Sequence, residues 1–212
     1  MDTWILGNPD SRTVLVQMVD DHDLEVIETE YQNIRTLAPE KDFCLLTMKV
    51  NDWNNDLSPW VAPPVFGNTP FGTGATETLS SLLTEVPKDA ELYIGGYSLS
   101  GLFALWATCN CHVFKGVAAV SPSVWFPGFV DYAKENTPQT GSIYLSLGDR
   151  EEKTRNPVMA TVGSSIRQLH GIFTEKEIPC ILEWNEGNHF RQPDVRMARG
   201  FAWLLNRYEN PV

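Results

Sequence analysis

Short apolar runs rich in β-branched residues alternate along the chain with segments whose apolar residues recur every three or four positions. Runs of the first kind predict strands, and segments of the second kind predict helices. This alternation is typical of an α/β domain that has a mainly parallel sheet with helices on both of its faces. We expect the strands at residues 3–6, 13–19, 43–50, 92–96, 116–120, 143–147 and 180–184.

The first two predicted strands flank the segment Asn8-Pro9-Asp10-Ser11, whose residue types favour turns. We therefore expect residues 3–6 and 13–19 to pair as an antiparallel hairpin that opens the sheet. The acidic run at residues 20–23 follows the second strand, and carboxylates at such a place cap a helix and offset its dipole. A metal site is the alternative interpretation of this run.

Four segments repeat apolar residues at helical spacing, and Asn156-Pro157 is a typical start for the third of them. A long connection rich in Trp, Pro and Gly spans residues 51–74. Compact domains rarely keep such a connection unless it builds a binding site. The apolar residues that define the four helices are Ile27, Tyr31, Ile34 and Leu37; Leu79, Leu82, Leu83 and Val86; Met159, Val162, Ile166 and Leu169; and Val195, Ala198, Ala202 and Leu205.

The length of 212 residues suits one domain, so we expect residues 1–212 to form a single unit without a separate lid domain. The chain has 16 basic and 27 acidic residues and a net charge of −11. A charge of this sign repels phosphate backbones and argues against a nucleic-acid partner. No apolar run approaches the roughly 20 residues of a membrane-spanning helix, and the N-terminus lacks the basic start of a signal peptide. We expect a cytoplasmic protein that does not bind membranes.

The four cysteines, at positions 44, 109, 111 and 180, follow no disulfide spacing. The run Cys109-Asn110-Cys111-His112 has one residue between its cysteines, whereas zinc-binding pairs usually have two to four. We therefore expect buried free thiols, no metal site and no cofactor.

The segment Gly-Gly-Tyr-Ser-Leu-Ser-Gly at residues 95–101 is the strongest candidate for chemistry. It continues a predicted strand and leads directly into a helix-forming segment. A serine on a sharp strand-to-helix turn between small residues is a nucleophile elbow, which presents the Ser98 hydroxyl above the sheet. The usual pattern has glycine two positions after the serine, where this chain has Ser100. An ordinary glycine-rich strand-to-helix turn is the alternative.

A serine hydroxyl is a weak nucleophile at neutral pH and needs a base that is held by an acid. Of the four histidines, His189 follows the last predicted strand and lies at the carboxyl edge of the sheet, where Ser98 also emerges. We therefore expect His189 to be the base.

The acid is expected directly after the strand at 143–147, where the chain reads Gly-Asp-Arg-Glu-Glu. Glu151 has the spacing from Gly148 that is common in this type of fold, whereas Asp149 is nearest to the strand end. Glu152 is a third candidate. The sequence leaves the choice among these carboxylates open.

With these segments the chain resembles the putative-esterase branch of the α/β-hydrolase superfamily, which includes enterochelin esterase-like proteins and S-formylglutathione hydrolases. The resemblance implies an α/β-hydrolase fold and ester hydrolysis by a serine, an acid and a histidine, here Ser98, Glu151 and His189. The segments that carry the resemblance are residues 95–101, Ser121-Pro122-Ser123-Val124-Trp125, residues 147–151 and Gly187-Asn188-His189-Phe190.

Two backbone N–H groups are expected to form an oxyanion hole. One is that of Leu99, directly after the nucleophile, and the other is that of Asp20 or Asp21, after the strand at 13–19. Aromatic residues on the loops that follow strands are expected to form a substrate wall, with packing onto the core as the alternative. They are Trp53, Trp60, Phe66, Phe71 and Trp125.

The sequence thus predicts a serine hydrolase that cleaves a small-molecule carboxylic ester through an acyl-enzyme on Ser98. An acyltransferase that uses the same three residues is one alternative. A catalytically inactive hydrolase fold that acts as a binding module is the other.

Overall fold

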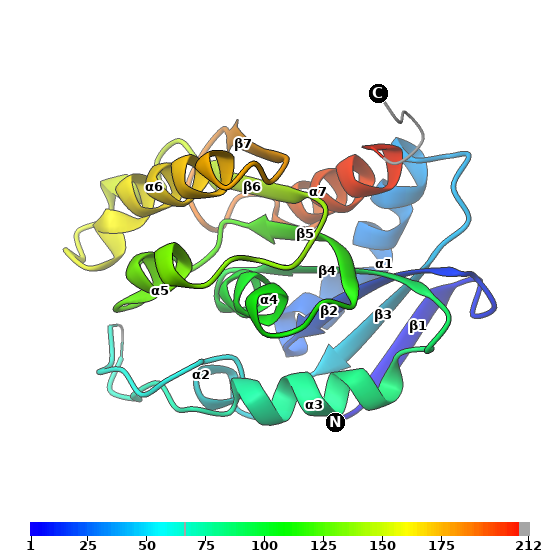
Figure 1. Ribbon diagram of the computed structural model, residues 1–212, viewed down its shortest axis with the longest axis horizontal. Coiled ribbons are helices and arrows are strands. Elements are labelled where there is room, and N and C mark those ends of the chain that lie inside the picture. The colour runs from blue at the N-terminus through cyan, green and yellow to red at the C-terminus, as the bar shows by residue number, and fades with distance from the viewer. Residues whose placement is uncertain (66, 208–212) are drawn as a thin grey trace.

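The computed structural model describes residues 1–65 and 67–207 and places seven strands in one sheet, with helices on both faces (Figure 1). The strands are β1 (Thr3–Gly7), β2 (Thr13–Val19), β3 (Cys44–Lys49), β4 (Glu91–Tyr97), β5 (Phe114–Val120), β6 (Ile143–Gly148) and β7 (Cys180–Asn185). The helices are α1 (Asp21–Leu37), α2 (Trp53–Asp56), α3 (Ala75–Glu85), α4 (Leu99–Asn110), α5 (Phe129–Glu135), α6 (Val162–Glu175) and α7 (Pro193–Arg207), with 3₁₀ turns at Glu151–Lys153 and Met159–Thr161. The strand order is β1-β3-β2-β4-β5-β6-β7.

All neighbouring strands run parallel except β1 and β3, which confirms the predicted α/β class with a mainly parallel sheet. Helices α1 and α7 pack together on one face, and α3, α4, α5 and α6 cover the other (Figure 1). In β2, the Leu15 side chain packs on the face that α1 and α7 cover, and the side chains of Val14 and Val16 pack on the opposite face. Because successive side chains of a strand point to opposite faces, a strand covered on both sides must be apolar throughout.

The predicted hairpin between the first two strands is wrong. β1 pairs antiparallel with β3, so that Trp4 lies opposite Thr47, and β2 runs parallel between β3 and β4. β2 is buried along almost its whole length, whereas β1 is almost entirely exposed. An apolar strand buries most surface inside the sheet, so β3 takes the edge of β2 that a hairpin would use and β1 lies outermost.

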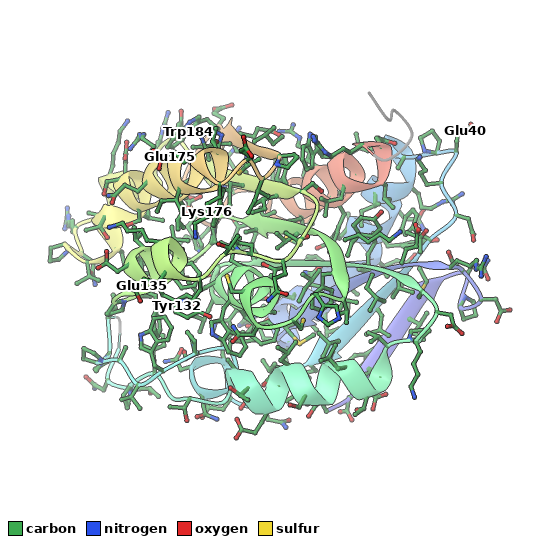
Figure 2. All side chains as sticks on the ribbon, in the orientation of Figure 1. Glu40, Tyr132, Glu135, Glu175, Lys176 and Trp184 are labelled. Carbon is green, nitrogen blue, oxygen red and sulfur yellow. The ribbon has the colours of Figure 1, made fainter. Side chains whose placement is uncertain are left out.

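Helix α5 is not predicted by the sequence, because seven residues are too few for a helical period to emerge. Its last carbonyls, those of Ala133 and Lys134, accept hydrogen bonds from the Lys176 ammonium at 3.0 and 2.8 Å. In Figure 2, Lys176 lies between α5 and α6. A cation is favoured at the C-terminal end of a helix, so this contact both caps α5 and ties it to α6.

Helix α6 begins later than its predicted start at Asn156-Pro157. The Asn156 side chain accepts hydrogen bonds from the N–H groups of Val158 and Met159, as a helix cap does. The backbone then forms a 3₁₀ turn over Met159–Thr161, and the α-helix begins only at Val162.

The acidic run at residues 20–23 caps α1. The Asp20 carboxylate accepts the Asp23 N–H at 2.9 Å, and the Asp23 carboxylate accepts the Asp20 N–H at 3.1 Å. This reciprocal pair is a capping box. Burial, with added repulsion from Asp20, raises the pKa of Asp23 to about 6.

In the part of the chain that the structure describes, the helices are too short or too polar to cross a bilayer. Within the same residues, no three His, Cys, Asp or Glu side chains gather where they could hold a metal ion. The four cysteines are free thiols, but only Cys44 is fully buried, and Cys109, Cys111 and Cys180 are partly buried. Burial raises the pKa of Cys109 and of Cys180 to about 12, which keeps both thiols protonated and unreactive at neutral pH.

Glu30 of α1 faces the sheet and is only 3% exposed. Its Oε1 atom and that of the buried Gln17 have no hydrogen-bond partner among residues 1–65 and 67–207. Burial raises the pKa of Glu30 well above its ordinary value, repulsion from Asp23 adds to the rise, and Gln17 offsets only part of it. Glu30 therefore binds a proton more tightly in the folded state than in the unfolded state.

We predict that Glu30→Gln reduces the dependence of stability on pH. A carboxyl whose pKa rises on folding stabilises the folded state below its ordinary pKa, and this contribution is lost as the pH rises through the raised value. Each unit of pKa shift that is titrated costs the wild type about 1.4 kcal/mol of unfolding free energy. The variant lacks this loss, which urea unfolding at a series of pH values between about 5 and 8 would measure.

The matched control is Glu25→Gln, since Glu25 is exposed on the same helix. This variant should lose stability with rising pH as steeply as the wild type does. Equal slopes for the wild type and Glu30→Gln would contradict the prediction.

Candidate active site

Ser98 lies on a sharp turn between β4 and α4. Its backbone has φ 58° and ψ −122°, a conformation that residues other than glycine rarely adopt. The Ser98 N–H donates to the Val120 carbonyl at 3.2 Å, and the Ser98 carbonyl accepts the Ser123 N–H at 2.9 Å. Such strain persists only where neighbouring contacts hold it, and here they come from β5 and the loop after it.

Small residues make this turn possible. A Cβ atom on Gly96 would lie 2.4 Å from the backbone of Ser100, and one on Gly101 would lie 2.7 Å from the Gly96 carbonyl. The Ser100 hydroxyl uses this space and donates to the buried carbonyl of Met18 at 2.8 Å. Serine therefore fits where the usual elbow has glycine, and its hydrogen bond fixes the end of β2 beside the turn.

His189 approaches Ser98 from the loop between β7 and α7. Its Nε2 atom lies 3.1 Å from Ser98 Oγ, and its Nδ1 atom lies 2.7 Å from Glu151 Oε2. The ring packs against Tyr97 with their centroids 5.1 Å apart, and the Tyr97 hydroxyl donates to the His189 carbonyl at 2.6 Å. These contacts hold the imidazole between a hydroxyl and a carboxylate.

Glu151 is buried in the 3₁₀ turn that follows β6. Its Oε1 atom accepts three hydrogen bonds, from Ser121 Oγ at 2.7 Å, the Gly148 N–H at 2.7 Å and Arg196 Nη1 at 3.0 Å. Burial by itself raises the pKa of this carboxyl, but the hydrogen bond and charge of His189, together with Ser121 and Gly148, outweigh burial. The pKa of Glu151 consequently lies below its ordinary value, and the group is a carboxylate at neutral pH.

The other two carboxylates of this turn bind elsewhere. Asp149 accepts the N–H of Gly187 at 2.8 Å and thereby holds the backbone of the His189 loop. Glu152 pairs with Arg167 of α6 at 2.9 Å. Of the three carboxylates that the sequence leaves open, Glu151 is the one in contact with His189.

Arg196, near the start of α7, joins the parts of this site, and its side chain is 3% exposed. The guanidinium reaches the carboxylate, the ends of β4 and β5, and two backbone carbonyls of the His189 loop. Its acceptors are Glu151 Oε1 at 3.0 Å, Ser121 Oγ at 3.2 Å, Tyr97 Oη at 3.3 Å, the Glu186 carbonyl at 3.0 Å and the Asn188 carbonyl at 3.1 Å.

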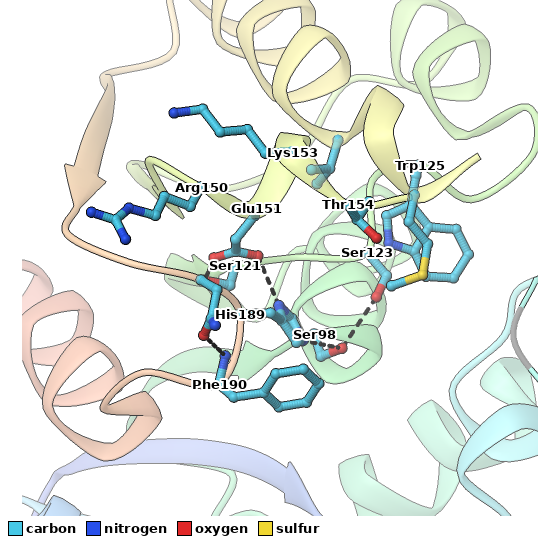
Figure 3. A pocket seen from close by; sticks show the side chains of 13 residues that line it. Ser98, Ser121, Ser123, Trp125, Arg150, Glu151, Lys153, Thr154, His189 and Phe190 are labelled. Carbon is cyan, nitrogen blue, oxygen red and sulfur yellow. Dashed lines mark hydrogen bonds and ion pairs between the residues drawn. The ribbon is translucent and has the colours of Figure 1, made fainter. Parts of the chain in front are cut away.

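A cavity of about 550 Å³ opens beside Ser98 (Figure 3). Its volume suits a small organic molecule. Phe190 lines it with a side chain that is 86% exposed and stands edge-on to the His189 ring. The lining residues are Ser98, Ser121, Ser123, Trp125, Arg150, Glu151, Lys153, Thr154, Met159, Val162, Asn188, His189 and Phe190.

A comparison of the sequence with protein-family models and with curated proteins gives no match. The structure is similar to siderophore hydrolase EstA from Aspergillus nidulans, with a TM-score of 0.70 and 17% identity over 97% of this chain and 94% of EstA. An IroE-like serine hydrolase from Shewanella oneidensis gives a TM-score of 0.71 and 13% identity over 97% of this chain and 76% of that one. The chain has the α/β-hydrolase fold.

The enterobactin esterase FES from Shigella flexneri has the same α/β-hydrolase fold as this chain, with a TM-score of 0.65 and 20% identity. The similarity covers 98% of this chain and 56% of FES. At such identities the likeness establishes the fold alone.

In the α/β-hydrolase fold, the oxyanion donors are the N–H after the nucleophile and an N–H from the loop that here follows β2. Leu99 is the first residue of α4, so its N–H has no acceptor within the helix. The Asp20 N–H already donates to Asp23, which contradicts the expectation for Asp20. Asp21, the first residue of α1, remains the candidate for the second donor, while its side chain pairs with Lys49.

The predicted substrate wall is largely wrong. Trp125 lines the cavity, but Trp53, Trp60 and Phe71 do not. Phe71 belongs to the core, where its ring contacts Phe126, and the partly buried Trp60 and Trp53 pack against the same core. Aromatic side chains gain most when they are fully buried, and residues 51–74 are long enough to fold back over the sheet. Phe66 lies outside the described residues.

Sequence reasoning missed Arg196, Ser121 and Tyr97, which support Glu151 and His189. Arg196 carries one usable signal, because a cation near the start of a helix opposes the helix dipole and needs a reason to be there. Ser121 lies in the Ser-Pro-Ser segment noted above and has φ 44°, a strained conformation that only the structure reveals.

We predict that Arg196→Met destabilises the fold by about 3–5 kcal/mol, because it leaves the buried Glu151 carboxylate without its cation. Urea unfolding measures the loss. In the double variant Glu151→Gln/Arg196→Met the buried charge is absent too, so the loss should be smaller than the sum of the two single losses.

Arg199→Met is the matched control, since Arg199 lies one turn further along α7 and pairs with Glu183 at the surface. It should cost less than about 1 kcal/mol. Strictly additive losses in the double variant would contradict the coupling between Arg196 and Glu151.

Proposed function

We propose that this chain is a serine hydrolase that cleaves a carboxylic ester through an acyl-enzyme on Ser98. The observation that carries the proposal is the continuous hydrogen-bonded series from Ser98 Oγ through the His189 ring to Glu151 Oε2, with distances of 3.1 and 2.7 Å. In this series His189 is the general base. Glu151 is the acid that orients the imidazole and stabilises its cationic form.

The nucleophilic step follows from this arrangement. Ser98 Oγ attacks the acyl carbonyl carbon while its proton moves to His189 Nε2. The carbonyl oxygen becomes an oxyanion, for which the N–H groups of Leu99 and Asp21 are the proposed donors. The N-terminal end of α4 beneath Ser98 also favours negative charge there.

The intermediate then collapses, and the alkoxide leaves with the proton from His189 Nε2. The acyl group remains on Ser98 Oγ. Water attacks this ester with His189 again as base, which releases the carboxylic acid and restores the serine hydroxyl. The series needs no cofactor, and its only reactants are the ester and water.

The similar structures support ester cleavage as the reaction class, since they include proteins named as siderophore hydrolases and as an enterobactin esterase. We therefore propose a small-molecule ester as the substrate, with siderophore esters first among those to test. A cytoplasmic location, a single domain over residues 1–212 and the absence of a nucleic-acid partner remain predictions from the sequence.

We predict that a fluorophosphonate probe labels Ser98 and that Ser98→Ala abolishes both labelling and ester hydrolysis. The probe phosphonylates a serine only when a neighbouring base takes the hydroxyl proton. Mass spectrometry of the labelled peptide identifies the residue. Ser123→Ala is the matched control, because its hydroxyl lies 3.3 Å from Ser98 Oγ without contacting the imidazole. Labelling that persists in Ser98→Ala would overturn the proposal, and hydrolysis that is absent from the wild type would favour a binding module.

We predict that Glu151→Gln lowers kcat for ester hydrolysis by about 10³- to 10⁴-fold, because an amide cannot hold the imidazole in the productive tautomer. Asp149→Asn should change kcat by less than about threefold, since its side-chain oxygen still accepts the Gly187 N–H. Steady-state kinetics on a 4-nitrophenyl ester separates the two. A large loss in Asp149→Asn with a small loss in Glu151→Gln would reverse the assignment of the acid.

A further inference from the structure

Two cations line the cavity beside Ser98 in a chain whose net charge is −11. They are Arg150 and Lys153, and both side chains are exposed. Neither makes an ion pair or a side-chain hydrogen bond with any residue that the structure describes. Their charges are therefore available to a molecule in the cavity.

Three other arginines near the site form ion pairs, unlike Arg150 and Lys153. Arg167 pairs with Glu152, Arg191 pairs with Glu186, and Arg196 pairs with Glu151. The carboxylate that lines the cavity, Glu151, is thus already balanced by a buried guanidinium and directs its second oxygen to His189. The charge of Lys153 also helps to lower the pKa of Glu152, but the ion pair of Glu152 is with Arg167. Neither carboxylate therefore forms an ion pair with Arg150 or Lys153.

The backbone of residues 150–153 explains how one short turn holds Glu151 against His189 and also carries the two cations. The Lys153 N–H donates to the Arg150 carbonyl at 3.1 Å, which closes a 3₁₀ turn. With three residues per turn, positions 150 and 153 lie on the same face. Glu151 lies between them on another face, where it meets His189. The turn therefore directs its carboxylate to the imidazole and places Arg150 and Lys153 side by side at the rim of the cavity, with their flexible side chains extending outward (Figure 3).

Another part of the cavity wall is apolar rather than charged. Trp125, Met159 and Val162 form an apolar part of its wall. Figure 3 shows Arg150 and Lys153 on one side, Trp125 on the opposite side and Ser98 below and between them. An ester whose carbonyl carbon lies at Ser98 can thus extend one portion toward the cations and the other toward the apolar wall.

We propose that Arg150 and Lys153 form an anion subsite that binds a carboxylate or another negatively charged group of the ester substrate. The inference rests on the proposed function and names the substrate class for the same site. Because the chain as a whole repels anions, a local pair of cations at the cavity also directs an anionic ester to Ser98.

Two pairs of esters test the proposal, each with one anionic and one neutral member of similar size. 4-Nitrophenyl hydrogen glutarate and 4-nitrophenyl methyl glutarate differ in charge on the acyl side. 4-Acetoxybenzoate and its methyl ester differ in charge on the alcohol side. The readout is the ratio of kcat/KM for the anionic member to that for the neutral member. Comparing this ratio between wild type and variant removes both the intrinsic reactivity of the esters and any general loss of activity.

We predict that Arg150→Gln/Lys153→Gln lowers this ratio by about three- to tenfold for at least one pair, as expected for two solvent-exposed charge contacts. Charge reversal in Arg150→Glu/Lys153→Glu should lower it further. Raising NaCl from about 0.05 to 0.5 M should reduce the wild-type ratio toward that of the double variant, because salt screens exposed charges.

Arg155→Gln is the matched control, since Arg155 is an exposed cation two residues further along that does not line the cavity. Its ratio should equal that of the wild type. An unchanged ratio in the double variant for both pairs would overturn the subsite while leaving the proposed hydrolase intact.

A binding measurement tests the anion subsite independently of the proposed ester hydrolysis. With Ser98→Ala, NMR titration of 4-acetoxybenzoate gives a dissociation constant without turnover. Removal of both cations should raise that constant by about three- to tenfold. Failure of the wild type to hydrolyse any of the four esters, combined with this shift in binding, would overturn the hydrolase and support the anion subsite.

Discussion

A carboxylate can remain charged inside a protein only where donors surround it, and Glu151 has four of them. They come from the ends of β5 and β6, from α7 and from the His189 loop. The position of the imidazole therefore depends on contacts that span most of the second half of the sheet. Arg196 is central to this arrangement, because its guanidinium contacts both the carboxylate and the backbone that carries His189.

The parallel sheet explains how residues far apart in the chain meet at one place. Strands β4, β5, β6 and β7 are neighbours in that order, so their carboxyl ends lie side by side at one edge. Ser98, Ser121, Glu151 and His189 each follow one of these strands. The strained backbones of Ser98 and Ser121 are stabilised by hydrogen bonds across the same edge, so the fold supports the strain that presents the hydroxyl.

The cavity has a charged part and an apolar part, and both are formed by segments at the carboxyl edge of the sheet. The 3₁₀ turn after β6 directs a carboxylate inward and two cations outward, while the loop after β5 and the start of α6 supply apolar side chains. The proposed acid and the proposed anion subsite thus come from adjacent residues of one turn. A shift of that turn would change the position of the proposed acid and of the proposed anion subsite together.

Local patterns along the sequence determined the types of most elements, the elbow at Ser98 and His189 as its candidate partner, because these depend on neighbouring residues and on chain order. Strand pairing was decided only by the tertiary structure, since β3 competes with β1 for the edge of β2 through burial that no local segment reveals. The contact between Glu151 and His189 was decided in the same way, because Asp149, Glu151 and Glu152 differ little in sequence but face different partners on one turn. The contacts of Arg196, the partial burial of Trp60 and the full burial of Phe71 likewise depend on packing between distant segments, which a one-dimensional pattern does not contain.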